Sequence, residues 1–310
     1  MTTTPDRPAG LERLQHGNHV AEVAPAIGGS LASFCREEQP GGLRHHWLRP
    51  AGADALRAGS PLGMASFPLV PWCNRIRDGR FEWRGRQIRL PPNADGSPHT
   101  MHGIGWRRPW AVTARSADAI ELVLREAGDG AWPFPFVAVQ RYQLDSRGLS
   151  ISLSLRNTGD EPMPAGIGHH PYFPHVRGGA GTQVQADVAA IWLSDRDLLP
   201  TALSTEHPTV AALHDGMLLD AYDLDNNFTG FGHRARVSWP DGSGLVLDAQ
   251  PPLDYFVLYT PAAEDFFVME AVSNCTDWVN QRSRSVADVG GMALAPGATL
   301  QAVTRFTPEA

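Results

Sequence analysis

Short segments in which apolar and polar residues alternate recur along the chain, and glycine and proline residues separate them. The alternation is almost strict over 149–155, where the sequence reads LSISLSL. Side chains of a strand point alternately to opposite faces, so this pattern predicts a strand with one buried face. Similar patterns predict strands at 112–115, 119–124, 136–144, 235–239, 245–247, 255–259, 266–272 and 299–306. Long segments with a 3.6-residue apolar period are missing, which favours an all-β protein.

Turn sequences indicate how some of these strands pair. The segment 145–148 (DSRG) joins two predicted strands, and 240–244 (PDGSG) joins another two, so we expect an antiparallel hairpin at each place. Many short strands with turns between them are typical of a sandwich or barrel. The basic segment 75–90 also alternates around a glycine-containing turn. We interpret it as a half-exposed hairpin with a solvated arginine face, and the alternative is a phosphate-binding patch for a sugar phosphate.

Length and composition favour one domain. A chain of 310 residues can form a single large β domain, and it contains neither an internal repeat nor a linker-like tract. The first residues are polar and include Pro5 and Pro8. We therefore predict a single domain over 1–310, with about residues 1–15 as a disordered tail.

Charge and hydropathy exclude some classes of function. The formal net charge is −7, which argues against a surface that neutralises nucleic-acid phosphates. No apolar run approaches the roughly 20 residues of a membrane-spanning helix, and 1–10 lacks the apolar core of a secretory leader. The three cysteines are widely separated and odd in number, which fits reduced thiols better than disulfides. We expect a cytoplasmic protein without nucleic-acid or membrane partners.

Glu270 is the first candidate for chemistry. It lies in FFVMEAV (266–272), where the residues on both alternating faces are otherwise apolar, so the strand is predicted to be buried on both sides. A carboxylate there is costly unless it is paired or used. The alternative is a structural glutamate that completes a hydrogen-bond network.

The histidines are less distinctive. His169 and His170 are adjacent in GIGHHPYFP, so only one of them can face a given pocket, and in isolation a structural role is favoured for either. His99 and His102 in HTMHG invite a metal hypothesis. Their spacing is common, however, and no CxxC or HExxH motif accompanies it, so we predict no metal site.

Two further residues have both a structural and a functional interpretation. Arg75 follows PWCN, and its guanidinium can bind sugar hydroxyls or pair with a surface acid. Asp225 lies in LDNNF, which we interpret as a polar loop, and segments rich in Asp and Asn are usually turns.

Taken together, these segments resemble the aldose 1-epimerase (galactose mutarotase) family over about 28–306. The resemblance rests on five motifs in the same order: Asn74-Arg75; His102-Gly103 with Trp106 and Trp110; Gly168 to Phe173; Leu224 to Phe228; and Tyr259-Thr-Pro261 with Met269 to Asn274, Thr276-Asp277 and Asn280. It implies an all-β, large antiparallel β-sandwich, the galactose mutarotase-like supersandwich. Departures at Ile104, Pro171 and Ala271 suggest a divergent bacterial branch and leave the sugar open.

The resemblance also implies roles for residues. His170, rather than His169, becomes the catalytic acid and Glu270 the base, while His102 lies near the ring oxygen. Asn74, Arg75 and Asp225 become substrate-binding residues. Free pKa values of about 4.3 for glutamate and 6.5 for histidine place the ionised pair between them. Mutual attraction across the site is expected to extend this interval upward by favouring protonated His170.

The implied function is an aldose 1-epimerase, or mutarotase. Such an isomerase interconverts the α and β anomers of a free monosaccharide without a cofactor, by acid/base ring opening and reclosure. Three alternatives remain at this stage: a hexose-6-phosphate 1-epimerase, a non-catalytic carbohydrate-binding sandwich and, more remotely, a glycosidase or polysaccharide lyase. A monomer or a homodimer is expected.

Overall fold

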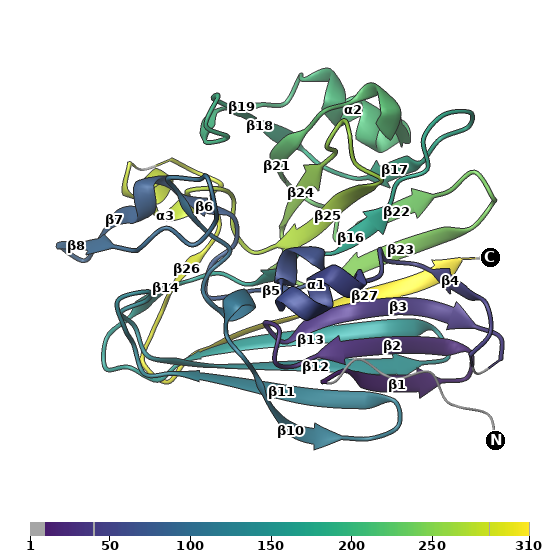
Figure 1. The fold of residues 1–310 in the computed structure, drawn as a ribbon. Helices are drawn as coiled ribbons and strands as arrows, with labels where there is room; N and C mark the ends of the chain where they lie inside the picture. The colour runs from purple at the N-terminus through teal and green to yellow at the C-terminus, as the bar shows by residue number, and fades with distance from the viewer. Residues whose placement is uncertain (1–9, 40, 285, 310) are drawn as a thin grey trace.

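The computed structural model describes residues 10–39, 41–284 and 286–309, and strands dominate them (Figure 1). The largest sheet has nine antiparallel strands. In spatial order these are β10 (Ala111–Arg115), β11 (Ala119–Glu126), β12 (Phe136–Asp145), β13 (Gly148–Asn157), β27 (Thr299–Glu309), β23 (Gly244–Ala249), β22 (Arg234–Ser238), β17 (Gln183–Ala186) and β20 (Met217–Leu218).

A second antiparallel sheet of eight strands carries much of the candidate site. Its order is β19 (Pro200–Ser204), β18 (Ala190–Ser194), β21 (Asp225–Thr229), β24 (Tyr255–Tyr259), β25 (Phe266–Val272), β15 (Gly168–His169) and β5 (Pro68–Leu69), with β16 (Tyr172–Pro174) also paired to β25. A four-stranded sheet comprises β1 (Glu12–His16), β2 (His19–Ala24), β3 (Ser30–Glu37) and β4 (Arg44–His46). Strands β1 and β2 contact β12, and Figure 1 shows them in front of the nine-stranded sheet.

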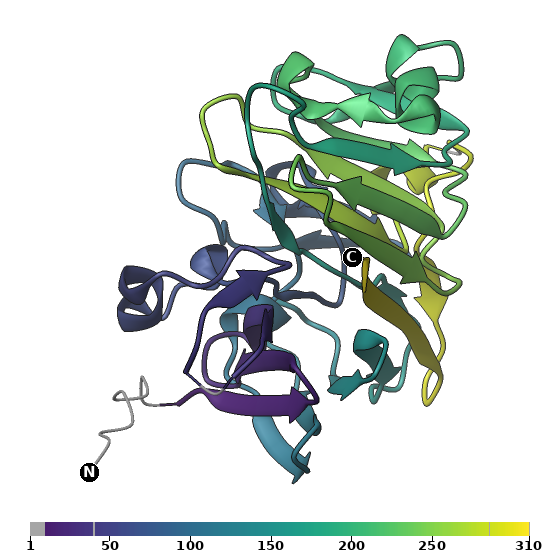
Figure 2. The same cartoon turned by 90° about the vertical axis from the view of Figure 1, so that its right-hand side faces the viewer.

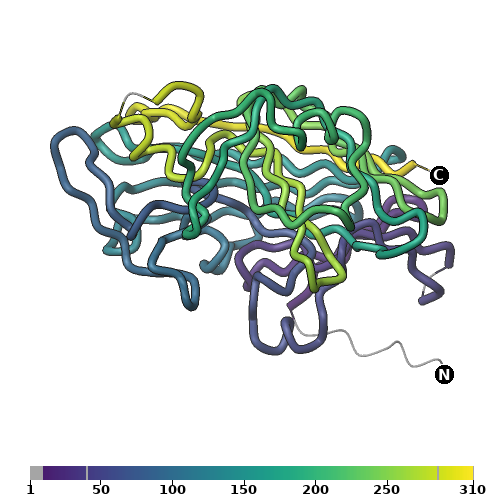
Figure 3. The backbone as a smooth tube through the Cα atoms, turned by 90° about the horizontal axis from the view of Figure 1, so that it is seen from above, coloured from purple at the N-terminus to yellow at the C-terminus, as the bar shows by residue number. Residues whose placement is uncertain are grey.

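The remaining elements are short. Three strand pairs lie outside the large sheets: β14 (Met163–Ala165) with β26 (Met292–Leu294), β6 (Arg75–Ile76) with β9 (Thr100–Met101), and β7 (Arg80–Trp83) with β8 (Arg86–Arg89). The α-helices are α1 (Ala53–Ala58), α2 (Pro208–Asp215) and α3 (Trp278–Ser283). The 3₁₀ turns are η1 (Pro61–Gly63), η2 (Arg77–Gly79), η3 (Gly105–Arg107) and η4 (Leu219–Ala221). Figures 2 and 3 show the segment with α1 projecting beyond the sheets. No described helix is long and apolar enough to cross a membrane.

The predicted all-β antiparallel sandwich is confirmed. Every strand predicted from alternation is present, and β12–β13 and β22–β23 form the two expected hairpins. The basic segment contains the predicted half-exposed hairpin, but only over 80–89, where β7 pairs with β8: Phe81 and Ile88 are buried, whereas Arg80 and Arg86 are exposed. Residues 75–76 pair instead with β9. The predicted tail was too long, because residues 12–15 pair with β2 through their backbone; residues 1–9 lie outside the described part.

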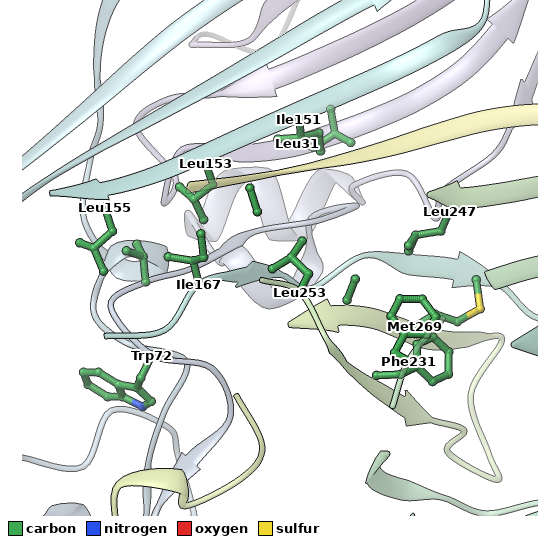
Figure 4. Close-up of a cluster of buried hydrophobic side chains, with 14 of the residues drawn as sticks. Leu31, Trp72, Ile151, Leu153, Leu155, Ile167, Phe231, Leu247, Leu253 and Met269 are labelled. Atoms are coloured by element: carbon green, nitrogen blue, oxygen red, sulfur yellow. The ribbon is translucent and has the colours of Figure 1, made fainter. Parts of the chain in front are cut away.

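One continuous apolar cluster joins the three large sheets. It draws buried side chains from Leu14 on β1 to Phe306 on β27. Figure 4 shows a part of it, in which Leu31 of the four-stranded sheet is drawn with Ile151 and Leu153 of β13 and with Met269 of β25. Burial of this apolar surface is the main force that holds the layers together.

Candidate active site

Strand β25 separates the core from the candidate site. Its odd-numbered residues Phe267, Met269 and Ala271 belong to the large core cluster. The opposite face carries Val268 and Glu270, and Val268 packs in a smaller apolar cluster with Phe67, Leu69, Cys73, Trp106, Tyr172, Val257 and Val272. Glu270 is only 2% exposed, so the prediction of a carboxylate in a doubly buried strand is confirmed.

The neighbouring histidines diverge to opposite sides, as expected for adjacent residues of extended backbone. His169 points into the core, where its Nε2 lies 2.8 Å from Oε1 of Gln140 on β12. His170 lies on the other side, with its Nε2 3.3 Å from Oε1 of Glu270. His169 therefore has a structural hydrogen bond, and His170 is the histidine that meets the glutamate.

Two loops bring His102 and Asn74 to the same place. Both residues have positive φ angles, 63° for His102 and 59° for Asn74, and the His102 amide donates a 3.0 Å hydrogen bond to the Asn74 carbonyl oxygen. Gly103 follows with a φ of 72°, and a Cβ atom there would lie 2.0 Å from the Val70 carbonyl oxygen. Only glycine fits this close approach without displacing backbone.

Arg75 and Asp225 form an ion pair beside these loops. The Nη2 atom of Arg75 donates to Oδ2 of Asp225 at 2.9 Å, and the Asn74 side-chain oxygen accepts from both the amide and the Nη1 of Arg75. Asp225 begins strand β21 and pairs with Tyr259 on β24, so its prediction as a loop residue was wrong. Pairing with β24 gives this backbone the hydrogen bonds that the side chain would supply in an Asx turn.

All six candidate residues line one cavity of about 640 Å³, which we call the site cavity. Its lining consists of Asn74, Arg75, His102, His170, Asp225 and Glu270, together with Arg49, Leu62, Met101, Tyr172, Leu198, Asp223, Leu224, Val257, Tyr259 and Phe266. His99 does not line it and instead accepts a hydrogen bond from the Asp78 amide through Nδ1. Within the described residues, no three His, Cys, Asp or Glu side chains gather as metal ligands.

The second group of lining residues was not assigned to the site from sequence. Phe266 could have been predicted from the sequence, because it lies on the same face of the alternating strand β25 as Glu270. Arg49, in contrast, follows the short strand β4 and belongs to no alternating pattern or motif. Its place in the cavity depends on contacts between segments that are far apart in the sequence.

Burial sets the protonation of the acid/base pair. It lowers the pKa of His170 to about 3, an effect to which Arg49 and Arg75 add. It raises the pKa of Glu270 well above its usual range; Asp225 adds to this effect and Arg75 opposes it. These directions favour a protonated Glu270 beside a neutral His170. The expectation of an ionised pair used the pKa values of free groups, and burial of both side chains acts against it.

Three buried polar atoms in the cavity have no hydrogen-bond partner within the described part of the chain. They are Nδ1 of His102, Nδ1 of His170 and Oε2 of Glu270. The His170 ring is held in place by Phe67, which stacks on it at 4.6 Å between ring centroids. Buried polar atoms normally find a partner, so this cluster is suited to a ligand rich in hydroxyl groups.

Comparison with known proteins identifies the family. A family model described as aldose 1-epimerase matches residues 11–307. The chain belongs to the aldose 1-epimerase family. Within this family, it is 31% identical to the uncharacterized protein YphB of Escherichia coli K12 over 292 residues, which cover 92% of this chain and 93% of that protein.

Solved structures share the fold of this aldose 1-epimerase family member. A protein of E. coli K12 assigned as an aldose 1-epimerase superposes with a TM-score of 0.84 at 27% identity, covering 96% of this chain and 98% of that one. A galactose mutarotase-like protein of Clostridium acetobutylicum gives a TM-score of 0.83 at 20% identity, with 96% and 94% covered. Family membership supports a mutarotase-like isomerase that acts on a carbohydrate.

Proposed function

We propose that this protein interconverts the α and β anomers of an aldose by acid/base ring opening and reclosure, without a cofactor. The observation that carries the proposal is the 3.3 Å contact between His170 Nε2 and Glu270 Oε1 in the site cavity. About 640 Å³ is in the usual range for small-molecule sites. Asn74, Arg75 and Asp225 supply polar groups that orient hydroxyls.

Ring opening requires two proton transfers. Glu270, as a carboxylate, takes the proton from the anomeric hydroxyl, and His170, as an imidazolium, gives a proton to the ring oxygen while the C1–O5 bond breaks. The product is an open-chain aldehyde beside a protonated Glu270 and a neutral His170. Rotation about C1–C2 presents the other face of the carbonyl, and reclosure returns both protons along the same path.

The buried pair is suited to this cycle because it holds one proton in total. Burial favours the protonated glutamate and the neutral histidine, which are the forms present at the aldehyde stage. Hydroxyls of a bound cyclic sugar stabilise the glutamate carboxylate by hydrogen bonding, and the proton then passes to His170 across the 3.3 Å contact. The site thus stabilises the ring-opened state relative to the bound ring.

The variant Glu270→Gln tests the assignment. Glutamine keeps the shape of the side chain but cannot accept the anomeric proton, so we expect kcat for anomer interconversion to fall by about 10²-fold or more. Polarimetry of freshly dissolved α-anomers of several aldoses measures the rate. A folded Glu270→Gln protein with near-normal turnover would contradict the role of Glu270.

Glu37→Gln is the matched control. Glu37 is also buried, at 3% exposure, but it lies on β3 and pairs with Arg13 rather than lining the cavity. We expect it to lower stability and to leave kcat near that of the parent protein, with circular dichroism as the check on folding. If the parent protein itself accelerated no aldose, the carbohydrate-binding alternative would be favoured over catalysis.

A further inference from the structure

Arg49 is a cation at the site cavity that the proposed acid/base chemistry does not use. Its guanidinium carbon lies 3.9 Å from the ring centroid of Tyr172 and 4.5 Å from that of Phe266. Stacking on two aromatic rings holds the guanidinium plane in a defined orientation. This wall of the cavity is therefore positively charged as well as aromatic.

Hydrogen bonds hold Arg49 rigidly. Its backbone amide donates to the Tyr172 carbonyl at 2.9 Å, and Nη2 donates to the carbonyl oxygens of Leu62 and Met64 at 2.8 and 3.1 Å. These bonds occupy one nitrogen of the guanidinium, and a side-chain hydrogen bond to Tyr172 adds to them. Within the described residues, Nη1 and Nε have no backbone acceptor. A donor that is already ordered binds a ligand with little further loss of entropy.

The charge of Arg49 is not matched by a nearby carboxylate. Arg75, the other arginine at the cavity, is paired with Asp225 at 2.9 Å. Arg49, in contrast, forms no salt bridge within 4.0 Å in the described part of the chain, although Asp265 and Glu264 act on it from farther away. Burial accordingly lowers its pKa. A partly desolvated cation of this kind is stabilised by an anion that enters the cavity.

The position of Arg49 relative to the acid/base pair selects one part of the sugar. The ring centroids of His170 and Tyr172 are 4.7 Å apart, and the Arg49 guanidinium carbon lies 3.9 Å from the Tyr172 centroid, so Arg49 and His170 are neighbours of the same tyrosine ring. Phe266 is four residues before Glu270 on the same strand face, or roughly 13 Å along the strand. The exocyclic carbon of an aldopyranose is bonded to the ring carbon next to the ring oxygen. A sugar whose ring oxygen lies at His170 can therefore direct its exocyclic group toward Tyr172 and Arg49, which line the same cavity.

We propose that the preferred substrate is an aldose whose exocyclic carbon is a carboxylate, a hexuronate, and that Arg49 binds this carboxylate. The proposal rests on the anomer interconversion proposed above and names its substrate class. One unmatched positive charge suits a monoanion. A phosphate dianion would place a second negative charge in a cavity that also contains Asp223, Asp225 and Glu270.

The test compares matched pairs of sugars in the parent protein and in Arg49→Gln. The kcat/KM for anomer interconversion is measured for D-glucuronate and D-glucose, for D-galacturonate and D-galactose, and for D-glucose 6-phosphate. We expect the parent protein to prefer each uronate, and the ratio of uronate to neutral sugar to fall about tenfold or more in Arg49→Gln. The preference should also shrink as sodium chloride is added.

Arg49→Lys and Arg196→Gln complete the design. Lysine keeps the charge and should retain part of the uronate preference. Arg196 is 93% exposed and does not line the cavity, so its replacement removes one positive charge from the surface and should leave the ratio unchanged. An equal fall for uronates and neutral sugars in Arg49→Gln would overturn the proposal, because it would mean that Arg49 only supports the cavity wall.

Two other outcomes distinguish a wrong substrate class from a failure of the proposed catalysis. Preference for D-glucose 6-phosphate over D-glucuronate would overturn the assignment to a carboxylate. If no sugar were interconverted, the proposed catalysis would fail, and calorimetric titration with D-glucuronate would then decide the role of Arg49 separately. Binding that is tighter than for D-glucose and lost in Arg49→Gln would support that role, and equal binding would overturn it.

Discussion

The direct contact between His170 and Glu270 makes the two side chains one titrating unit. Phe67 covers one face of the imidazole, and burial opposes a charge on either group. Groups coupled in this way gain and lose protons as a pair, so the two observable pKa values belong to the pair. The form that holds one proton is the form that the proposed cycle needs.

The pH dependence follows from these directions. Burial lowers the pKa of His170 to about 3, so a second proton is added only in strong acid. It raises the pKa of Glu270 well above its usual range, so the single proton is lost only at a pH well above that range. We expect kcat/KM to stay level over a window that extends below about 4.3, toward the His170 value of about 3, and that ends on the alkaline side at the raised pKa of Glu270.

Stopped-flow polarimetry from pH 3 to 9, with the spontaneous rate subtracted, measures this window. The variant Arg75→Gln serves as a comparison: Arg75 disfavours a charge on His170 and favours one on Glu270, so its loss should move both limbs to higher pH. A bell-shaped profile confined to about pH 4.3–6.5 would contradict the neutral resting pair.

At the residue scale, sequence reasoning identified Glu270 on physical grounds and His170 only through the family resemblance. In the structure, the two histidines are distinguished by Gln140 on β12, whose side chain hydrogen-bonds to His169. Gln140 is 29 residues from His169 in the sequence, so no local pattern links the two residues. Arg49 was missed for the same reason: its neighbours Tyr172 and Phe266 are far from it in the sequence.

At the scale of elements, the candidate site is carried largely by strands too short to show a period. β5, β6, β9 and β15 have two residues each, whereas alternation needs at least four to be recognised. The long strands β12, β13, β25 and β27 were predicted because one or both of their faces are buried along most of their length. Sequence thus predicted the framework well and the loops around the site poorly.

Gly103→Ala tests how tightly one of these loops is packed. A Cβ atom would meet the Val70 carbonyl oxygen at 2.0 Å, and the φ of 72° is itself unfavourable for alanine. We expect the free energy of unfolding to fall by about 2 kcal/mol or more. The rate of anomer interconversion should also fall, because a shift of the backbone at Gly103 displaces the preceding residue, His102. Urea denaturation measures the first effect and polarimetry the second.

Gly242→Ala is the control for this variant. Gly242 also has a positive φ, 88°, but nothing lies within 4 Å of the position of its Cβ atom. Its replacement should lower the free energy of unfolding by about 1 kcal/mol, because alanine is strained at this positive φ angle. The rate of anomer interconversion should not change. Equal losses of stability in the two variants would show that the loop yields to the added methyl group.

At the scale of the whole molecule, the continuous core predicts cooperative unfolding. Buried tryptophans report on different parts of the chain, among them Trp47 after β4, Trp132 before β12 and Trp278 in α3. We expect urea transitions followed by tryptophan fluorescence and by far-ultraviolet circular dichroism to coincide. Separate transitions would indicate that the four-stranded sheet, or another layer, unfolds independently.

The rim of the site cavity differs from its floor. Leu62 and Leu198 line the cavity but are 51% and 37% exposed, and both lie outside the paired strands. The floor, by contrast, is strand β25, whose other face belongs to the core. A library that randomises the two rim loops can therefore be screened for new sugar preferences at small cost to folding, which makes this framework a practical starting point for directed evolution.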